Sequence, residues 1–330
     1  MKIAAHGKSL LLCLLSAVIL ILSFPRFDLG FLAGVGLLPL FFCLEGKSPL
    51  SSFLLSYLCG FLFFLGTIYW LIHVTVLGWL LLCLYLAIYL GIFGFLFSRF
   101  AIGLPRTLSL FLIPGAWTVL EYLRTHLLTG FGWELLGYSQ YKFLPLIQLA
   151  DLTGTYGISY FLVMTNLALY YWLKERRKVT WQIAVYSVLF AVIFAYGFFK
   201  LHQGSAPAGL KVAIVQGNIP QDWKWQEDKK SFILEKYALL TELAARENPQ
   251  LIIWPETAFP TYLWQEPELF ARVLELAKKV NRPLLIGLVT SERMAIYNSA
   301  MLISATGEPV QVYHKLHLVP YVYQKHDAHL

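Results

Sequence analysis

Residues 74–97 read VTVLGWLLLCLYLAIYLGIFGFLF, a run of 24 residues without one charged side chain. A membrane-spanning helix needs about 20 mostly apolar residues, so this run predicts one span. Six further apolar runs flank it, at 10–24, 29–44, 50–70, 108–123, 156–173 and 181–199. We therefore expect a polytopic membrane domain of about seven spans over residues 1–203.

The composition is typical of a chain that lies largely in a membrane. Hydrophobic residues make up 58% and charged residues 14% of the 330 residues, against about 45–50% and about 25% in soluble domains. Residues 1–206 hold 13 Lys and Arg against 6 Asp and Glu, whereas residues 207–330 hold 13 of each. These values exclude a disordered chain and a wholly soluble enzyme, and we expect no nucleic-acid partner.

The placement of positive charge predicts the orientation. With a cytoplasmic N-terminus, nine basic residues face the cytoplasm and four face the opposite side. The nine are Lys2, Lys8, Lys47, Arg99, Arg106, Lys174, Arg176, Arg177 and Lys178, and the four are Arg26, Arg124, Lys142 and Lys200. An odd number of spans then places residues 207–330 outside, in the periplasm if this is a bacterial inner membrane.

The composition changes at the Gly/Ser/Pro/Ala-rich linker 204–210, and the pattern beyond it is that of an α/β domain. Short apolar runs predict strands at 211–216, 251–254, 283–289, 297–303 and 309–313. Helical periodicity covers 229–246 and 267–280. The turn at 305–307 predicts a hairpin between the last two strands.

The segment 121–151, between two predicted spans, is aromatic, rich in glycine and lightly charged. It is typical of an interfacial aromatic belt or of a loop that shapes a lipid-accessible entrance. Glu121 and Arg124 are three residues apart, so on a helix they could pair, either as a structural ion pair or as a functional one.

Two charged residues follow predicted strands in the outer domain. Glu256 lies in LIIWPET at the end of 251–254, and Lys315 lies in YHKLHLVP after 309–313. A carboxylate in such a position can act as a general base, and an ammonium can stabilise an oxyanion. A surface ion pair without catalytic function is the alternative.

These motifs resemble two members of the Glu–Lys–Cys triad of the nitrilase, or carbon–nitrogen hydrolase, superfamily. The wider pattern resembles the apolipoprotein N-acyltransferase family of that superfamily. The segments that carry this resemblance are WTVLEYLR (117–124), VQGNIPQDWKW (215–225), WPETAFP (254–260), YNSAMLI (297–303) and YHKLHLVP (313–320). The resemblance implies a multi-span helical membrane domain followed by part of a nitrilase-like α-β-β-α sandwich outside the cytoplasm.

The resemblance also implies a reaction. An acyl chain passes from a phospholipid to a cysteine as a thioester, and then to the α-amine of diacylglyceryl-cysteine in an apolipoprotein. Glu256 would be the proton acceptor, Lys315 would stabilise the tetrahedral intermediates, and Trp225 would contact substrate. The partners implied are the phospholipid, the apolipoprotein and the bilayer, with no cofactor and no metal.

The chain departs from the family at the nucleophile, which in the family follows the lysine. The four cysteines are Cys13, Cys43, Cys59 and Cys83, all in the predicted spans. We therefore expect 211–330 to be an incomplete N-terminal part of the catalytic domain, inactive alone. A membrane-anchored amidase of the nitrilase type and a non-catalytic homologue that binds lipid remain alternatives.

Histidines near the C-terminus suggest a metal site, which we do not expect because a frayed terminus lacks fixed geometry. They are His314, His317, His326 and His329.

Overall fold

A computed structural model describes residues 2–101, 103–175, 181–204, 209–220, 223–259, 262, 266–292 and 295–316. The chain divides into two compact units, Met1–Gly204 and Ser205–Leu330. Each unit has a hydrophobic core of its own. The predicted fold class, a helical part followed by an α/β part, is confirmed.

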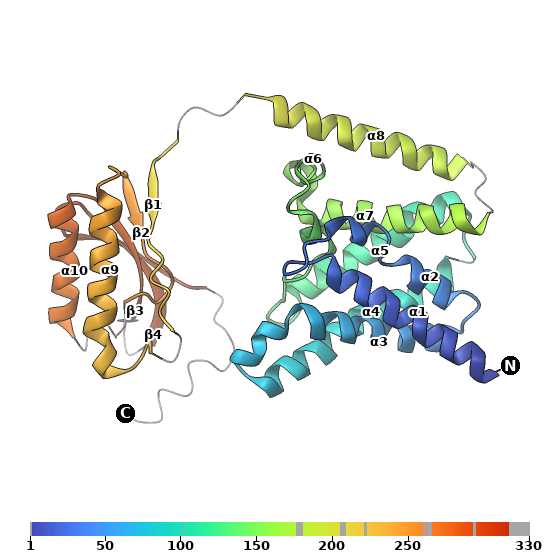
Figure 1. The fold of residues 1–330 in the computed structure, drawn as a ribbon, viewed down its shortest axis with the longest axis horizontal. Coiled ribbons are helices and arrows are strands. Elements are labelled where there is room, and N and C mark those ends of the chain that lie inside the picture. Colours follow the sequence, from blue (N-terminus) through green and yellow to red (C-terminus); the bar gives the residue numbers. More distant parts are fainter. Residues whose placement is uncertain are drawn as a thin grey trace. The chain divides into compact units, whose positions relative to one another are not determined.

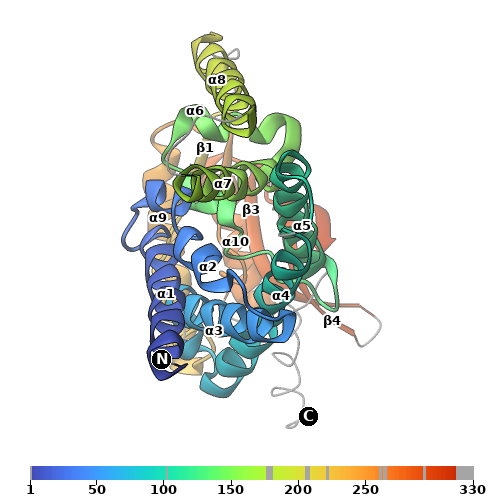
Figure 2. The same ribbon diagram turned by 90° about the vertical axis from the view of Figure 1, so that its right-hand side faces the viewer.

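The first unit is helical in its described residues (Figure 1). Its long helices are α1 (Lys2–Leu22), α3 (Pro49–Thr67), α4 (Val76–Phe100), α5 (Arg106–His126), α7 (Ala150–Lys174) and α8 (Trp181–His202). Its short ones are η1 (Gly30–Gly34), α2 (Leu38–Leu44), η2 (Tyr69–His73), η3 (Leu136–Gln140) and α6 (Leu144–Ile147). Helices α3 and α4 lie side by side in both views (Figures 1 and 2), and α8 packs mainly on α6 and α7.

Three of these helices, α3, α4 and α8, are long and apolar enough to cross a membrane. Side chains cap two of them, because Ser48 Oγ accepts from Ser51 N before α3 and Thr75 Oγ1 accepts from Gly78 N before α4. The apolar stretches Gly7–Leu22 and Gly30–Leu44 are shorter. The count of seven spans and the orientation of the N-terminus stay predictions.

One buried polar side chain ties distant parts of the helical unit together. Asn166 on α7 is fully buried, and its Oδ1 accepts a 2.8 Å hydrogen bond from Leu37 N before α2. Its Nδ2 donates to Ala33 O in η1 and to Leu162 O, at 2.8 Å each. Every hydrogen-bonding group of this amide therefore holds backbone in place.

In its described residues, the second unit is a five-stranded mixed sheet with two α-helices. The strands are β1 (Val212–Ile214), β2 (Leu251–Ile253), β3 (Leu284–Glu292), β4 (Ala295–Ile303) and β5 (Pro309–His314), in the order β1-β2-β3-β4-β5. The first three are parallel, and β4 and β5 run antiparallel to their neighbours. Helices α9 (Lys230–Ala245) and α10 (Pro267–Val280) cover one face (Figure 1), and the short turn η4 (Glu227–Lys229) precedes α9.

The two faces of this sheet differ in their surroundings. Ile252, Leu284 and Ile286 are fully buried in the core that includes α9 and α10. Side chains alternate between faces along a strand, so Val212 and Ile214 point the other way, and they are 39% and 78% exposed. By the same alternation, Gly287 of β3, Ala300 of β4 and Tyr313 of β5, which pair in one row, lie on this second face.

Candidate active site

Glu256 stands two residues after a buried anchor at the end of β2. Trp254 is 3% exposed, and its indole stacks on Tyr237 with ring centroids 4.9 Å apart. Trp254 Nε1 donates a 2.8 Å hydrogen bond to Thr241 Oγ1. Tyr237 and Thr241 both lie on α9. Their contacts with Trp254 therefore fix the backbone position from which the Glu256 turn begins.

The turn that carries Glu256 has an unusual backbone. Thr257 has a φ of 47°, in the left-handed region that a β-branched residue rarely adopts, and such a conformation costs about 1–3 kcal/mol. Gly287 of β3 supports this turn, because a Cβ there would lie 2.3 Å from Pro255 O and 2.7 Å from Glu256 Cα. The missing side chain at 287 lets the turn rest directly on the sheet.

Lys315 reaches the same place from the end of β5. Its backbone N–H donates a 2.8 Å hydrogen bond to Asn298 O on β4. Its Nζ lies 2.9 Å from Glu256 Oε1, an ion pair between residues 59 positions apart. The structure thus brings together the two residues that the sequence singled out.

Asn298 is a third member of this group that the sequence analysis did not single out. It is 4% exposed, and its Nδ2 donates a hydrogen bond to Glu256 Oε1. The signal that could have found it is an asparagine within the apolar strand segment YNSAMLI. A buried amide in such a segment needs a polar partner, and here the carboxylate provides it.

These neighbours favour the charged form of Glu256. The hydrogen bond from Lys315 lowers the pKa of the Glu256 carboxyl most, and the bond from Asn298 lowers it further. The charges of Lys315 and Lys224 act in the same direction, while partial burial opposes them. Glu256 is therefore a carboxylate at neutral pH and can accept a proton.

The ion pair lines a hollow of about 470 Å³. One wall is a row across three strands, in which Gly287 pairs with Ala300 and Ala300 with Tyr313. Glu256 and Lys315 stand at this row, with side chains that are 60% and 35% exposed. The charged atoms are accessible to a reacting group that enters the hollow.

Trp225, the third predicted site residue, stacks on Tyr262 with ring centroids 5.8 Å apart and does not belong to the described lining of the hollow. His314 Nδ1 lies 2.8 Å from Ser299 Oγ. The other three C-terminal histidines, His317, His326 and His329, lie outside the described residues. Within the described ranges, no group of three acidic, histidine or cysteine side chains could hold a metal ion.

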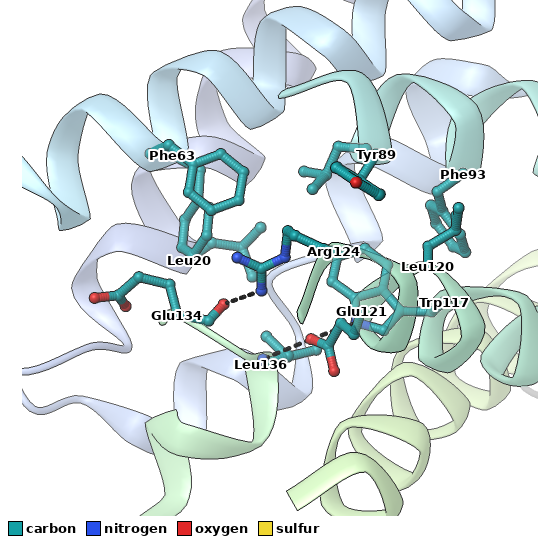
Figure 3. A pocket seen from close by; sticks show the side chains of 12 residues that line it. Leu20, Phe63, Tyr89, Phe93, Trp117, Leu120, Glu121, Arg124, Glu134 and Leu136 are labelled. Carbon is teal, nitrogen blue, oxygen red and sulfur yellow. Dashed lines mark hydrogen bonds between the residues drawn. The ribbon is translucent and has the colours of Figure 1, made fainter. Parts of the chain in front are cut away.

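The helical unit holds a separate buried polar cluster on α5 (Figure 3). The sequence suggested that Glu121 and Arg124 could pair. Among the described contacts, each of the two residues bonds the segment after α5. Arg124 donates to Trp133 O at 2.7 Å and to Glu134 O at 3.1 Å. Glu121 Oε1 accepts from Leu136 N at 2.7 Å. Glu121 is 5% exposed and Arg124 is 3% exposed, and their hydrogen bonds fix this segment to α5.

Comparison with known proteins finds a matching family for each unit. Residues 16–168 match the apolipoprotein N-acyltransferase N-terminal domain, and residues 211–330 match the carbon–nitrogen hydrolase family. Together with the mixed sheet, these matches define a member of the carbon–nitrogen hydrolase superfamily whose helices α3, α4 and α8 are long and apolar enough to cross a membrane. Within that superfamily, the chain belongs to the apolipoprotein N-acyltransferase family.

Relatives of this name occur in several bacteria. The apolipoprotein N-acyltransferase of Geobacter metallireducens is 35% identical over 96% of this chain and 65% of its own length. That of Bradyrhizobium diazoefficiens is 33% identical over 76% of this chain and 49% of its own. That of Methylococcus capsulatus is 30% identical over 95% of this chain and 64% of its own length. The chain thus spans about half to two thirds of the relatives that it matches.

Proposed function

We propose that this chain is part of an enzyme that transfers an acyl chain from a phospholipid to the N-terminal amine of diacylglyceryl-cysteine in apolipoproteins. The observation that carries the proposal is the pair of Glu256 Oε1 and Lys315 Nζ, 2.9 Å apart beside an open hollow. The names of its relatives support the substrate class.

The geometry supports a division of roles in acyl transfer. Glu256 takes the thiol proton, and the thiolate attacks the phospholipid ester carbonyl. Lys315 stabilises the negative charge that develops on the carbonyl oxygen. Glu256 returns the proton to the leaving alkoxide, so that a lysophospholipid departs and a thioester remains. In the second step the amine attacks the thioester carbonyl, and Glu256 accepts the amine proton. The C–S bond breaks as the amide forms, and Glu256 returns the proton to the departing thiolate, which regenerates the thiol.

The nucleophile is the part of this proposal that lies outside the described site. Residues 205–330 contain no cysteine, and the four cysteines of the helical unit are buried. The relatives are longer than this chain. We therefore propose that the thioester forms on a cysteine supplied by sequence outside residues 1–330.

The location of the reaction is likewise a proposal. Two lipid substrates require a catalytic unit at a membrane, and the apolar helices α3, α4 and α8 provide the anchor. The charge asymmetry of the loops supports a cytoplasmic N-terminus and a periplasmic catalytic unit in the bacterial inner membrane. Trp225, stacked on Tyr262, is proposed to contact the substrates.

The test compares residues 1–330 with the complete gene product, each incubated with a phospholipid that carries a labelled acyl group. Hydroxylamine-sensitive label is expected on the complete product and on no residue after 206 of the shorter chain. Glu256→Gln and Lys315→Met should abolish the label. Glu268→Gln and Lys279→Met, on the surface of α10, serve as matched controls. Label mapped beyond residue 206 in the shorter chain, or full labelling of Glu256→Gln, would overturn the proposal.

A further inference from the structure

Lys224 approaches the Glu256 turn from the loop between β1 and η4. Its Nζ donates a 3.2 Å hydrogen bond to Glu256 O and a 2.9 Å hydrogen bond to Thr257 Oγ1. The side chain is half-buried, so it is not a solvated surface lysine. None of the roles assigned above to Glu256 and Lys315 uses it.

The two bonds of Lys224 hold a strained segment. Thr257 is in the left-handed region at a φ of 47°, and such a conformation persists only where the surroundings enforce it. Gly287 supports the turn through close backbone contact, whereas Lys224 bonds a carbonyl and a hydroxyl of the same turn. The glycine contact and the lysine bonds together fix the position from which the Glu256 side chain extends.

Lys224 is also the second cation at this carboxylate. Lys315 bonds the Glu256 carboxylate from the end of β5, and Asn298 bonds it from β4. Lys224 bonds the backbone carbonyl of Glu256 from the β1–η4 loop. The hydrogen bond from Lys315 lowers the pKa of Glu256 most, and the charge of Lys224 adds a smaller effect in the same direction. Burial lowers the pKa of Lys224 itself, and the charge of Glu256 opposes that change. His314, next to Lys315, is engaged with Ser299 Oγ.

We propose that Lys224 is a positioning residue for Glu256, which fixes the backbone of the strained turn and places a second positive charge beside the carboxylate. It acts through Glu256 and does not bond the carboxylate that would receive the proton. The contacts of Lys224 are properties of this chain, whatever reaction it takes part in. Only their role in catalysis rests on the proposed function.

The experiment measures the protonation of Glu256 without any acyl transfer. The 330-residue chain in detergent is treated with a water-soluble carbodiimide and glycine ethyl ester between pH 3.5 and 7. Mass spectrometry of the peptide that contains Glu256 gives the extent of modification at each pH. Because the protonated carboxyl is the reactive form, the midpoint of modification follows the pKa of Glu256.

Three substitutions separate charge from hydrogen bonding. Lys224→Met removes both, Lys224→Gln keeps a donor without the charge, and Lys224→Arg keeps both. We expect the midpoint to rise in the Met and Gln variants, because a positive charge that lowers the pKa of Glu256 is lost, and to stay near the unsubstituted value in the Arg variant. Lys279→Met, which removes a surface lysine of α10, should leave it unchanged.

Unchanged midpoints in both Lys224→Met and Lys224→Gln would overturn the inference, as would a midpoint in Lys224→Arg as high as in Lys224→Met. If Lys224→Met does not fold, Lys224→Gln carries the test. A failed acyl-transfer assay would refute the proposed function and leave this measurement standing, so the two failures are distinguishable. In an active complete product, Lys224→Gln should lower kcat about 10-fold with little change in KM.

Discussion

Substituting Gly287 with alanine tests whether close backbone packing positions Glu256. The new Cβ would lie 2.3 Å from Pro255 O, 2.7 Å from Glu256 Cα and 2.7 Å from Thr257 N. All three atoms are backbone, so the turn must move by about 1 Å to reach ordinary contact distance, and such overpacking costs about 1–3 kcal/mol. The movement also strains the 3.1 Å hydrogen bond from Phe259 N to Gly287 O.

The loss should appear as a lower unfolding midpoint of the second unit. For a unit of this size, about 4 °C is lost per kcal/mol, so the midpoint should fall by about 4–12 °C. Proteolysis of the whole chain during a temperature ramp, followed by mass spectrometry of peptides from residues 205–330, gives that midpoint. Gly209→Ala is the matched control, because its Cβ would meet nothing within 4 Å. Equal midpoints in the two variants would refute the packing argument.

Two further predictions concern the helical unit and the dependence on pH. Asn166→Ala removes the partners of Leu37 N and Ala33 O, and each orphaned buried group costs about 1–3 kcal/mol; the thermal aggregation temperature in detergent should fall clearly below that of the unsubstituted chain, and an unchanged value would contradict the prediction. Because Lys315 lowers the pKa of Glu256, the stability from this pair is present above the ordinary carboxyl pKa of about 4.5 and is lost as the pH falls through the lowered value. The midpoint of the second unit should therefore drop more between pH 6 and pH 3 in the unsubstituted chain than in Lys315→Met, and equal drops would contradict it.

In the second unit, the sequence predicted element boundaries well where neighbouring residues alone decide them. The predicted helix 267–280 has the observed bounds of α10, which begins at Pro267 and ends before Asn281 in the left-handed conformation. Strand lengths were less accurate, because pairing decides where a strand ends. β1 covers only 212–214 of the predicted 211–216, whereas β3 continues to residue 292 because it pairs with β4 along its length.

The charged pair of the site could be predicted because each residue follows an apolar strand in a recognisable motif. The groups that position Glu256 could not, because their contacts depend on tertiary approach. Nothing in a single sequence shows that Gly287 would rest against Pro255, or that Lys224 rather than its neighbour Trp225 would bond the turn. The contacts of Glu121 and Arg124 are of the same kind, since both residues bond the segment after α5, which helical spacing alone does not predict.

The energetic contrast within the site indicates what its geometry is for. An ion pair with side chains 60% and 35% exposed contributes about 0–1 kcal/mol to stability. Around it the chain keeps a left-handed threonine, a buried amide and a half-buried lysine, each of which carries a local cost. A fold that needed only stability would gain by relaxing these features. Their presence around a pair of so little structural value fits a site in which the position and charge of Glu256 are the property that matters.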